Sequence, residues 1–220
     1  MAYSTFKKSV LYEQIKRGID LILSVSLVIL FSPLFLLIAL IIKVESPGPV
    51  FADTPERVGK KGKKFKMYKF RSMVPHAHHL LREDPQYAHL YNVYKQSSYK
   101  LRDDPRITRV GRFIRKYSLD ELPQFLNVLK GEMSVVGPRA YYPDELENQQ
   151  KKYPHTREAV KIVLSVKPGI TGFWQVSGRS EINFDKRIQM DALYVKKRSL
   201  MDDMFIILKS PWAMLSGKGV

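Results

Sequence analysis

Two adjacent carboxylates, Asp120 and Glu121, stand in the segment SLDELPQF at residues 118–125, directly after a strongly basic stretch at residues 102–116. A carboxylate among cationic side chains can act as a nucleophile or as a metal ligand in reactions of phosphates. The same letters match a capping box, in which Ser118 and Glu121 would satisfy each other's backbone amides at a helix start. The octapeptide alone therefore leaves a catalytic and a purely structural interpretation open.

Pro123 bears on this choice because proline favours the first position of a helix. A helix that begins at Pro123 would leave Asp120 and Glu121 in the preceding turn, facing outward near the positive end of the helix. Apolar residues at helical spacing follow, and Gly131 is expected to end the helix as its C-cap. The stretch before the carboxylates also has helical spacing, with Arg115 on a different face from its apolar residues.

The composition restricts the partners of the chain. Lysine and arginine outnumber aspartate and glutamate by 37 to 21, giving a formal net charge of +16 over 220 residues. Such a surplus indicates an anionic partner, namely nucleic acid, a membrane surface or phosphorylated substrates. The absence of cysteine excludes disulfides and thiolate chemistry. The histidines His76, His78 and His79 lack the companion ligands of a zinc site, so we expect a solvated loop or helix face there.

Residues 21–42 contain no charged side chain. A straight helix of this length would extend about 33 Å, enough to cross a bilayer core of roughly 30 Å. However, Ser32 and Pro33 interrupt the middle of the run, where proline removes a backbone hydrogen bond. Both flanks are basic, and positive residues favour the cytoplasmic side. We therefore favour a re-entrant hairpin broken at Ser32-Pro33 over a single spanning helix, although sequence logic alone leaves both open.

The rest of the chain predicts an α+β body that is mostly helical. We expect a basic, amphipathic segment at 1–18, a re-entrant membrane hairpin at 19–43 and a compact catalytic domain at 44–220, with interfacial amphipathic helices. Further expectations are a short basic strand at 60–73, an amphipathic helical cover at 76–101, glycine-rich turns at 167–180, a charged helix at 184–199 and an interfacial tail helix at 202–220.

Four motifs in this order resemble the bacterial sugar transferases, which are monotopic phosphoglycosyl transferases. They are KRGIDLILSVSLVILFSP, YKFRSM, DDPRITRVGRFIRKYSLDELPQFLNVLKGEMSVVGPR and KPGITGFWQVSGR, and the resemblance runs from about Lys16 to the C-terminus. The resemblance implies an enzyme at the cytoplasmic face of the bacterial inner membrane. It would transfer a sugar-1-phosphate from a UDP-sugar to a polyprenol phosphate such as undecaprenyl phosphate, releasing UMP, as the first membrane step of polysaccharide, O-antigen or exopolysaccharide synthesis.

The resemblance also implies roles for individual residues. Asp120 would be the nucleophile that forms a covalent phosphosugar intermediate, and Glu121 would be associated with Mg²⁺. Three basic residues match positions expected to hold phosphates, and Arg is suited to bidentate contact: Lys69, Arg115 and Arg139. Three further matches would bind substrate or serve as scaffold: Arg179, Asp191 and Tyr194. The kink at Ser32 and Pro33 matches the family's re-entrant anchor.

Two departures from the family pattern stand out. Ala140 follows Arg139 where the family usually has proline, so a turn beside an expected nucleotide contact differs. The larger members have additional N-terminal helices and an extra domain, so this chain would correspond to the catalytic core alone.

The contexts DDPRIT and PRAYYPDELE resemble those of family members that transfer hexose 1-phosphate, which implies UDP-glucose or UDP-galactose as the donor. The alternative function is a non-catalytic, basic membrane adaptor that binds anionic lipid. A nucleic-acid partner is not expected, because the basic patches lack interleaved aromatic stacking platforms and no known binding module is present. A homodimer stays open.

Overall fold

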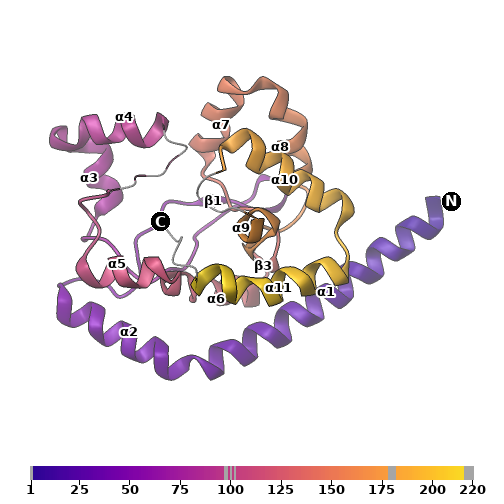
Figure 1. Cartoon of the computed structure of the whole chain (residues 1–220), viewed down its shortest axis with the longest axis horizontal. Coiled ribbons are helices and arrows are strands. Elements are labelled where there is room, and N and C mark those ends of the chain that lie inside the picture. Colours follow the sequence, from indigo (N-terminus) through magenta and orange to yellow (C-terminus); the bar gives the residue numbers. More distant parts are fainter. Residues whose placement is uncertain (1, 97–98, 100, 102, 178–181, 216–220) are drawn as a thin grey trace.

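A computed structural model describes residues 2–96, 99, 101, 103–177 and 182–215. Within these ranges the chain is mainly helical with two small two-stranded sheets (Figure 1), as predicted. The elements in chain order are α1 (Ala2–Leu30), α2 (Ser32–Glu45), β1 (Arg57–Val58), η1 (Lys60–Gly62), β2 (Lys64–Phe65), α3 (Ala77–Glu83), η2 (Pro85–Tyr87), α4 (Ala88–Gln96), α5 (Arg109–Lys116), η3 (Leu119–Glu121), α6 (Gln124–Lys130), β3 (Ser134–Val136), α7 (Pro143–Lys152), η4 (Pro154–Thr156), α8 (Arg157–Val163), β4 (Gly169–Thr171), α9 (Phe173–Ser177), α10 (Phe184–Lys197) and α11 (Leu200–Leu215).

The apolar segment is broken where the sequence predicts. Within the described residues, no helix alone combines the length and apolar character needed to cross a bilayer, whereas Val10–Leu30 and Ser32–Glu45 together do, with a bend of 59°. Pro33 has no N–H, so the carbonyl of Ile29 loses its helical donor. The Ser32 hydroxyl donates to that carbonyl at 2.8 Å and thereby replaces the missing bond.

The long helices α1 and α2 run along one side of the molecule, and α11 lies beside α1 (Figure 1). Large apolar side chains on these three helices are exposed to an unusual degree: Ile22, Ile29, Leu36, Leu40 and Val44 on α1 and α2, and Leu208 and Trp212 on α11. Trp212 alone is 81% exposed. An exposed apolar surface of this kind is typical of a membrane or protein contact.

The main core lies between these helices and the small parallel sheet. Strands β3 and β4 pair in parallel, with Ser134 opposite Gly169. Val128, Met133 and Ile206 are almost completely buried there, and apolar residues of α1 and α2 pack against the same cluster. A second core joins α7, α8 and α10 on the opposite side of the molecule. The parallel sheet thus lies between the apolar helices α1 and α2 and a second helical layer made of α7, α8 and α10.

Two expected elements differ from the structure. The helical cover at 76–101 is interrupted, because α3 ends at Glu83 and Pro85 starts the short η2 before α4. The carboxylate of Asp84 accepts a hydrogen bond from Gln86 N, which stabilises this break. The short strand expected within the basic segment 60–73, on the alternation of Phe65, Met67 and Lys69, is limited to β2, which pairs antiparallel with β1.

One glycine permits a close approach that positions the site. A Cβ on Gly111 would lie 1.9 Å from the carbonyl oxygen of Ser72, so only glycine fits where α5 contacts the extended chain there. Thr108 caps α5 through its hydroxyl, which accepts from Gly111 N, and its own N–H donates to Ser72 O. These contacts fix α5 beside the segment that includes Lys69.

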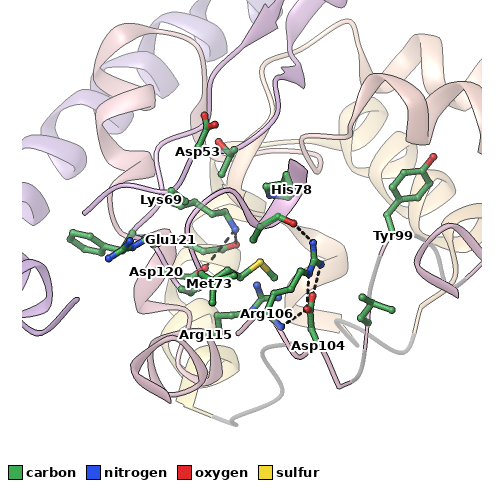
Figure 2. Close-up of a pocket in the computed structure, with 18 of the residues that line it drawn as sticks. Asp53, Lys69, Met73, His78, Tyr99, Asp104, Arg106, Arg115, Asp120 and Glu121 are labelled. Atoms are coloured by element: carbon green, nitrogen blue, oxygen red, sulfur yellow. Dashed lines mark hydrogen bonds and ion pairs between the residues drawn. The ribbon is translucent and has the colours of Figure 1, made fainter. Parts of the chain in front are cut away.

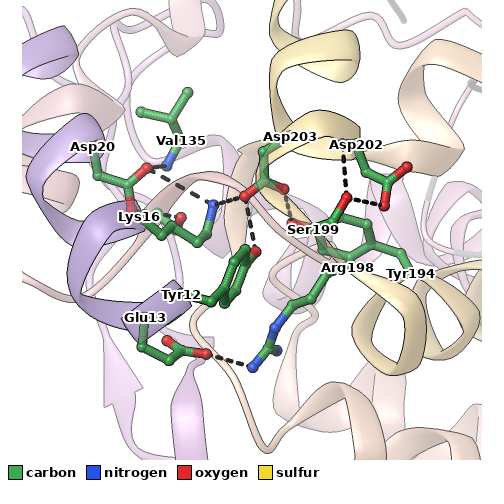
Figure 3. A network of polar contacts seen from close by, with 11 residues as sticks. Tyr12, Glu13, Lys16, Asp20, Val135, Tyr194, Arg198, Ser199, Asp202 and Asp203 are labelled. Carbon is green, nitrogen blue, oxygen red and sulfur yellow. Dashed lines mark hydrogen bonds and ion pairs between the residues drawn. The ribbon is translucent and has the colours of Figure 1, made fainter. Parts of the chain in front are cut away.

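A polar network ties α1 to the C-terminal half of the chain (Figure 3). The carboxylate of Asp203 accepts from Tyr12 Oη at 2.8 Å, Lys16 Nζ at 2.9 Å and Tyr194 Oη at 2.5 Å. Asp20, also on α1, accepts hydrogen bonds from the hydroxyl of Ser134 and from the backbone N–H of Val135. Tyr194 therefore connects α10 to this network.

Replacing Asp203 by alanine is expected to destabilise the protein. The change leaves Lys16 largely buried with only the more distant Asp20 carboxylate, at 4.0 Å, as a partner. We expect a loss of roughly 2–4 kcal/mol, or a fall in Tm of about 5–15 °C, in thermal unfolding of the detergent-solubilised chain. Asp202→Ala is the matched control, because Asp202 lies in the same helical turn but is exposed. Equal effects of the two changes would contradict the role of the network.

Candidate active site

A cavity of about 270 Å³ opens between the extended chain at 69–76, the α3–α4 segment, α5 and α9. Its lining includes both adjacent carboxylates and all three expected phosphate-binding cations: Asp120, Glu121, Lys69, Arg115 and Arg139. These residues come from segments far apart in the chain, and Figure 2 shows four of them, without Arg139, in the same part of the cavity. The structure thus brings together the central residues that the sequence singled out.

The turn that carries the carboxylates is not a capping box. Ser118 adopts a left-handed conformation with φ of 55°, and its side chain caps no backbone amide. Leu119–Glu121 form the short η3, and α6 begins at Gln124, with Pro123 as its N-cap residue, close to the predicted start. Gly131 ends α6 in a left-handed conformation, as predicted. The carboxylates do not both face outward: Asp120 is only 6% exposed and lines the cavity.

A single lysine stands between the two carboxylates. Lys69 Nζ lies 2.6 Å from Glu121 Oε1 and 3.9 Å from Asp120 Oδ2. Burial raises the pKa of Asp120, and the positive charge of Lys69 opposes that rise, while the neighbouring Glu121 adds to it. The backbone carbonyl of Asp120 accepts from Phe70 N at 2.9 Å, which holds the two segments in register. Asp120 is thus a poorly hydrated carboxylate beside a cation.

Asp191, which lies outside the cavity, binds the backbone of Arg139. The backbone N–H of Arg139 donates to Asp191 Oδ2 at 3.0 Å, and the hydroxyl of Tyr141 donates to the same oxygen at 3.2 Å. The guanidinium of Arg139 lies 5.6 Å from the ring of Trp174. Asp191 does not line the cavity, and its contacts hold the backbone of Arg139 in place. Burial raises the pKa of Asp191 to about 7.

The remaining predicted residues lie elsewhere. Tyr194 is absent from the cavity wall and belongs to the Asp203 network, so its contacts are also structural. Arg179 falls outside the residues that the structure describes. Ala140, which replaces the usual proline, is buried, and its carbonyl accepts from Arg57 Nη1 at 3.0 Å.

The cavity also contains residues that the sequence did not single out as site residues. They are Arg57, His78, Tyr94, Tyr99, Tyr142 and Gln175. His78 corrects the expectation of a solvated histidine cluster, because it is half-buried in the cavity wall, whereas His76 is exposed. A signal for His78 is its helical spacing from the buried Leu81, which places both on the inner face of α3.

No group of three or more aspartate, glutamate, histidine or cysteine side chains in the described ranges is arranged to hold a metal ion. The carboxylate pair nevertheless suits Mg²⁺, which usually binds one or two protein carboxylates together with waters and substrate phosphates. Glu121 is the more accessible of the two, with its side chain 33% exposed. It is the residue that would hold such an ion.

Comparison with known proteins identifies the family. The model of the family described as "Bacterial sugar transferase" matches residues 11–217, so the chain belongs to this family. Undecaprenyl-phosphate galactose phosphotransferase of Salmonella typhimurium is 43% identical over 93% of this chain and 41% of its own length. Exopolysaccharide production protein ExoY of Rhizobium meliloti is 40% identical over 93% of this chain and 87% of its own.

A third relative is named UDP-glucose:undecaprenyl-phosphate glucose-1-phosphate transferase, from Escherichia coli. It is 39% identical over 88% of this chain and 38% of its own length. The chain therefore spans about two fifths of the Salmonella and Escherichia relatives and most of ExoY. The matched region contains the whole cavity described above.

The buried Asp191 predicts a measurable pH dependence of stability. Its pKa rises from an ordinary value near 3.8 to about 7 in the folded chain, so folding takes up a proton between these values. Its contribution to stability is therefore complete below about pH 4 and is lost as the pH rises through about 7. Asp191→Asn should remove this slope, measured as the difference in Tm between native and variant from pH 5 to 8. Parallel plots of Tm against pH for the native chain and Asp191→Asn would contradict this role of Asp191. Asp185→Asn on the same helix is the control.

Proposed function

We propose that this chain is a phosphoglycosyl transferase that moves a sugar-1-phosphate from a UDP-sugar to undecaprenyl phosphate. The observation that carries the proposal is the buried Asp120 beside Lys69, in a cavity that also presents Arg115 and Arg139. Phosphoryl transfer depends mainly on positioning and on neutralising the phosphate oxygens, and this cavity combines a carboxylate nucleophile with three cations. The names of the relatives support the same reaction type.

The reaction takes place in two displacements. In the first, an oxygen of Asp120 attacks the phosphorus that carries the sugar, the phosphoanhydride bond breaks, and UMP leaves with the bonding electrons. In the second, a phosphate oxygen of the lipid attacks the aspartyl phosphosugar, a new phosphoanhydride forms and the carboxylate of Asp120 is regenerated. A soluble donor and a lipid acceptor can therefore use one site in turn.

The chain's own residues assist both steps. Lys69, Arg115 and Arg139 offset the negative charge of the phosphates, and Asp191 keeps the backbone of Arg139 in place. Bound Mg²⁺ at Glu121 would supply further charge neutralisation at the phosphate oxygens. We propose glucose or galactose as the transferred sugar, because two of the relatives are named for these hexoses.

The exposed apolar faces of α1, α2 and α11 support attachment to a membrane. We propose that α1 and α2 form a re-entrant hairpin in the bacterial inner membrane, with the catalytic body on its cytoplasmic face. The 59° bend and the satisfied carbonyl of Ile29 support this placement, because an unsatisfied backbone group is costly in lipid. Undecaprenyl phosphate would then reach the cavity from the membrane side.

Replacing the proposed nucleophile should abolish the reaction. We expect Asp120→Asn to lower UMP release by about 10³-fold or more, because the amide of asparagine cannot replace a carboxylate as the nucleophile. The measurement is UMP release in nanodiscs with undecaprenyl phosphate and a panel of UDP-sugars. Native chain without acceptor should give a phosphosugar adduct on the Asp120 peptide. Asp53→Asn, an exposed carboxylate at the cavity rim, is the control.

Two outcomes of that experiment would decide against the proposal. Near-native turnover of Asp120→Asn would remove the nucleophile assignment and leave the turn a structural feature. A native chain that releases no UMP with any donor would instead favour the basic membrane adaptor.

The re-entrant arrangement predicts that both ends of the apolar segment lie on one side of the membrane. The chain has no cysteine, so Lys7→Cys and Lys43→Cys can be labelled singly with a membrane-impermeant maleimide. Both should react in inside-out vesicles, and neither should react in intact cells. The exposed control Lys151→Cys on α7 should show the same pattern. Labelling of Lys7→Cys and Lys43→Cys from opposite sides would show a spanning helix instead.

A further inference from the structure

The cavity has a second compartment, distinct in chemistry from the carboxylate end. It is formed by Arg57, His78, Tyr94, Tyr99 and Tyr142, which all line the cavity and which we call the aromatic compartment. In Figure 2, Tyr99 lies on the opposite side of the cavity from Lys69 and the two carboxylates, with His78 between them. The aromatic compartment is not needed for the chemistry proposed above.

Arg57 is the most unusual residue of the compartment. It is only 5% exposed, and its guanidinium carbon lies 3.3 Å from the centroid of the Tyr142 ring, so the two planes are stacked. One of its nitrogens donates to the carbonyl of Ala140, but Arg57 Nε has no hydrogen-bond partner among the described residues. Nor does Arg57 form an ion pair with a described carboxylate. A buried donor left without a partner is costly, which points to an acceptor supplied by a ligand.

The other walls suit a flat, uncharged group. The rings of Tyr94 and Tyr99 are 5.1 Å apart, and those of Tyr99 and Tyr142 are 6.2 Å apart. Burial, together with the charges of Arg106 and Arg57, lowers the pKa of His78 to about 4. His78 is therefore neutral near pH 7, and its ring offers one hydrogen-bond donor and one acceptor.

The UDP-sugar donor of the proposed function contains a planar base that matches the aromatic compartment. A UDP-sugar carries a diphosphate between a sugar and a planar base, and the carboxylate end of the cavity already supplies three cations for the diphosphate. Bases are commonly bound by stacking on aromatic rings or on arginine planes, together with hydrogen bonds to their edges. The edge of uracil alternates carbonyl acceptors with one N–H donor, which complements a guanidinium and a neutral imidazole.

We propose that the stacked pair Arg57–Tyr142, with His78 on the adjacent wall, is the subsite that binds the uracil base of the donor. The inference rests on the proposed function. It assigns to Arg57 and His78 a role in nucleotide specificity and not in phosphoryl transfer. Since UMP leaves after the first displacement, this subsite serves only the first half of the reaction.

The test is the affinity of the chain in nanodiscs for UMP, measured by calorimetry. We expect Arg57→Gln to weaken UMP binding roughly 10-fold or more, and His78→Leu at least about 3-fold, because each removes a buried hydrogen bond to the base. Inhibition by glucose 1-phosphate or galactose 1-phosphate should stay unchanged. Transfer from the preformed Asp120 adduct to undecaprenyl phosphate should also stay unchanged. Arg82→Gln, an exposed arginine on α3 outside the cavity, is the control.

The outcomes separate this inference from the proposed function. Unchanged UMP affinity in both variants overturns the subsite. Weaker hexose 1-phosphate inhibition with unchanged UMP affinity overturns it too and assigns the compartment to the sugar. If Arg57→Gln does not fold, His78→Leu decides alone. UMP binding is measurable in the absence of turnover, so a failed transferase assay leaves this test intact.

Discussion

The burial of Asp120 beside Lys69 is the constraint on which the site depends. A carboxylate with so little exposure is strongly disfavoured in its ionised form unless a cation lies nearby, and Lys69 is that cation. Lys69 belongs to the extended chain after β2, whereas Asp120 follows α5, so the two segments must be held together. The bond from Phe70 N to the carbonyl of Asp120 and the close approach at Gly111 provide this.

The apolar helices and the cavity are parts of one arrangement. Phe35 and Ile38 of α2 pack in the same cluster as Phe70 and Ile114, and these two residues adjoin Lys69 and Arg115 in the chain. Helix α2 therefore packs directly beneath the segments that carry two cationic residues of the site. The apolar helices and the carboxylate site are thus joined through one shared cluster of side chains.

Local signals predicted the local features well. The break at Ser32-Pro33, the helix that follows Pro123 and the end of α6 at Gly131 each depend on backbone chemistry that one or two residues determine. The expected cavity residues came from the resemblance, since spacing alone did not separate a catalytic turn from a helix cap. The places of Asp191 and Arg57 could not be predicted in this way, because each depends on contacts between segments far apart in the chain.

The network around Asp203 also has a consequence for the order of folding. Tyr12 and Lys16 are synthesised before the carboxylate that binds them, which follows them by 191 and 187 residues. During synthesis Lys16 of α1 therefore stays unpaired by Asp203 until α11 has been made. Long-range contacts of this kind form late and slowly. The attachment of α1 to α11 through Asp203 therefore follows the synthesis of the elements between them.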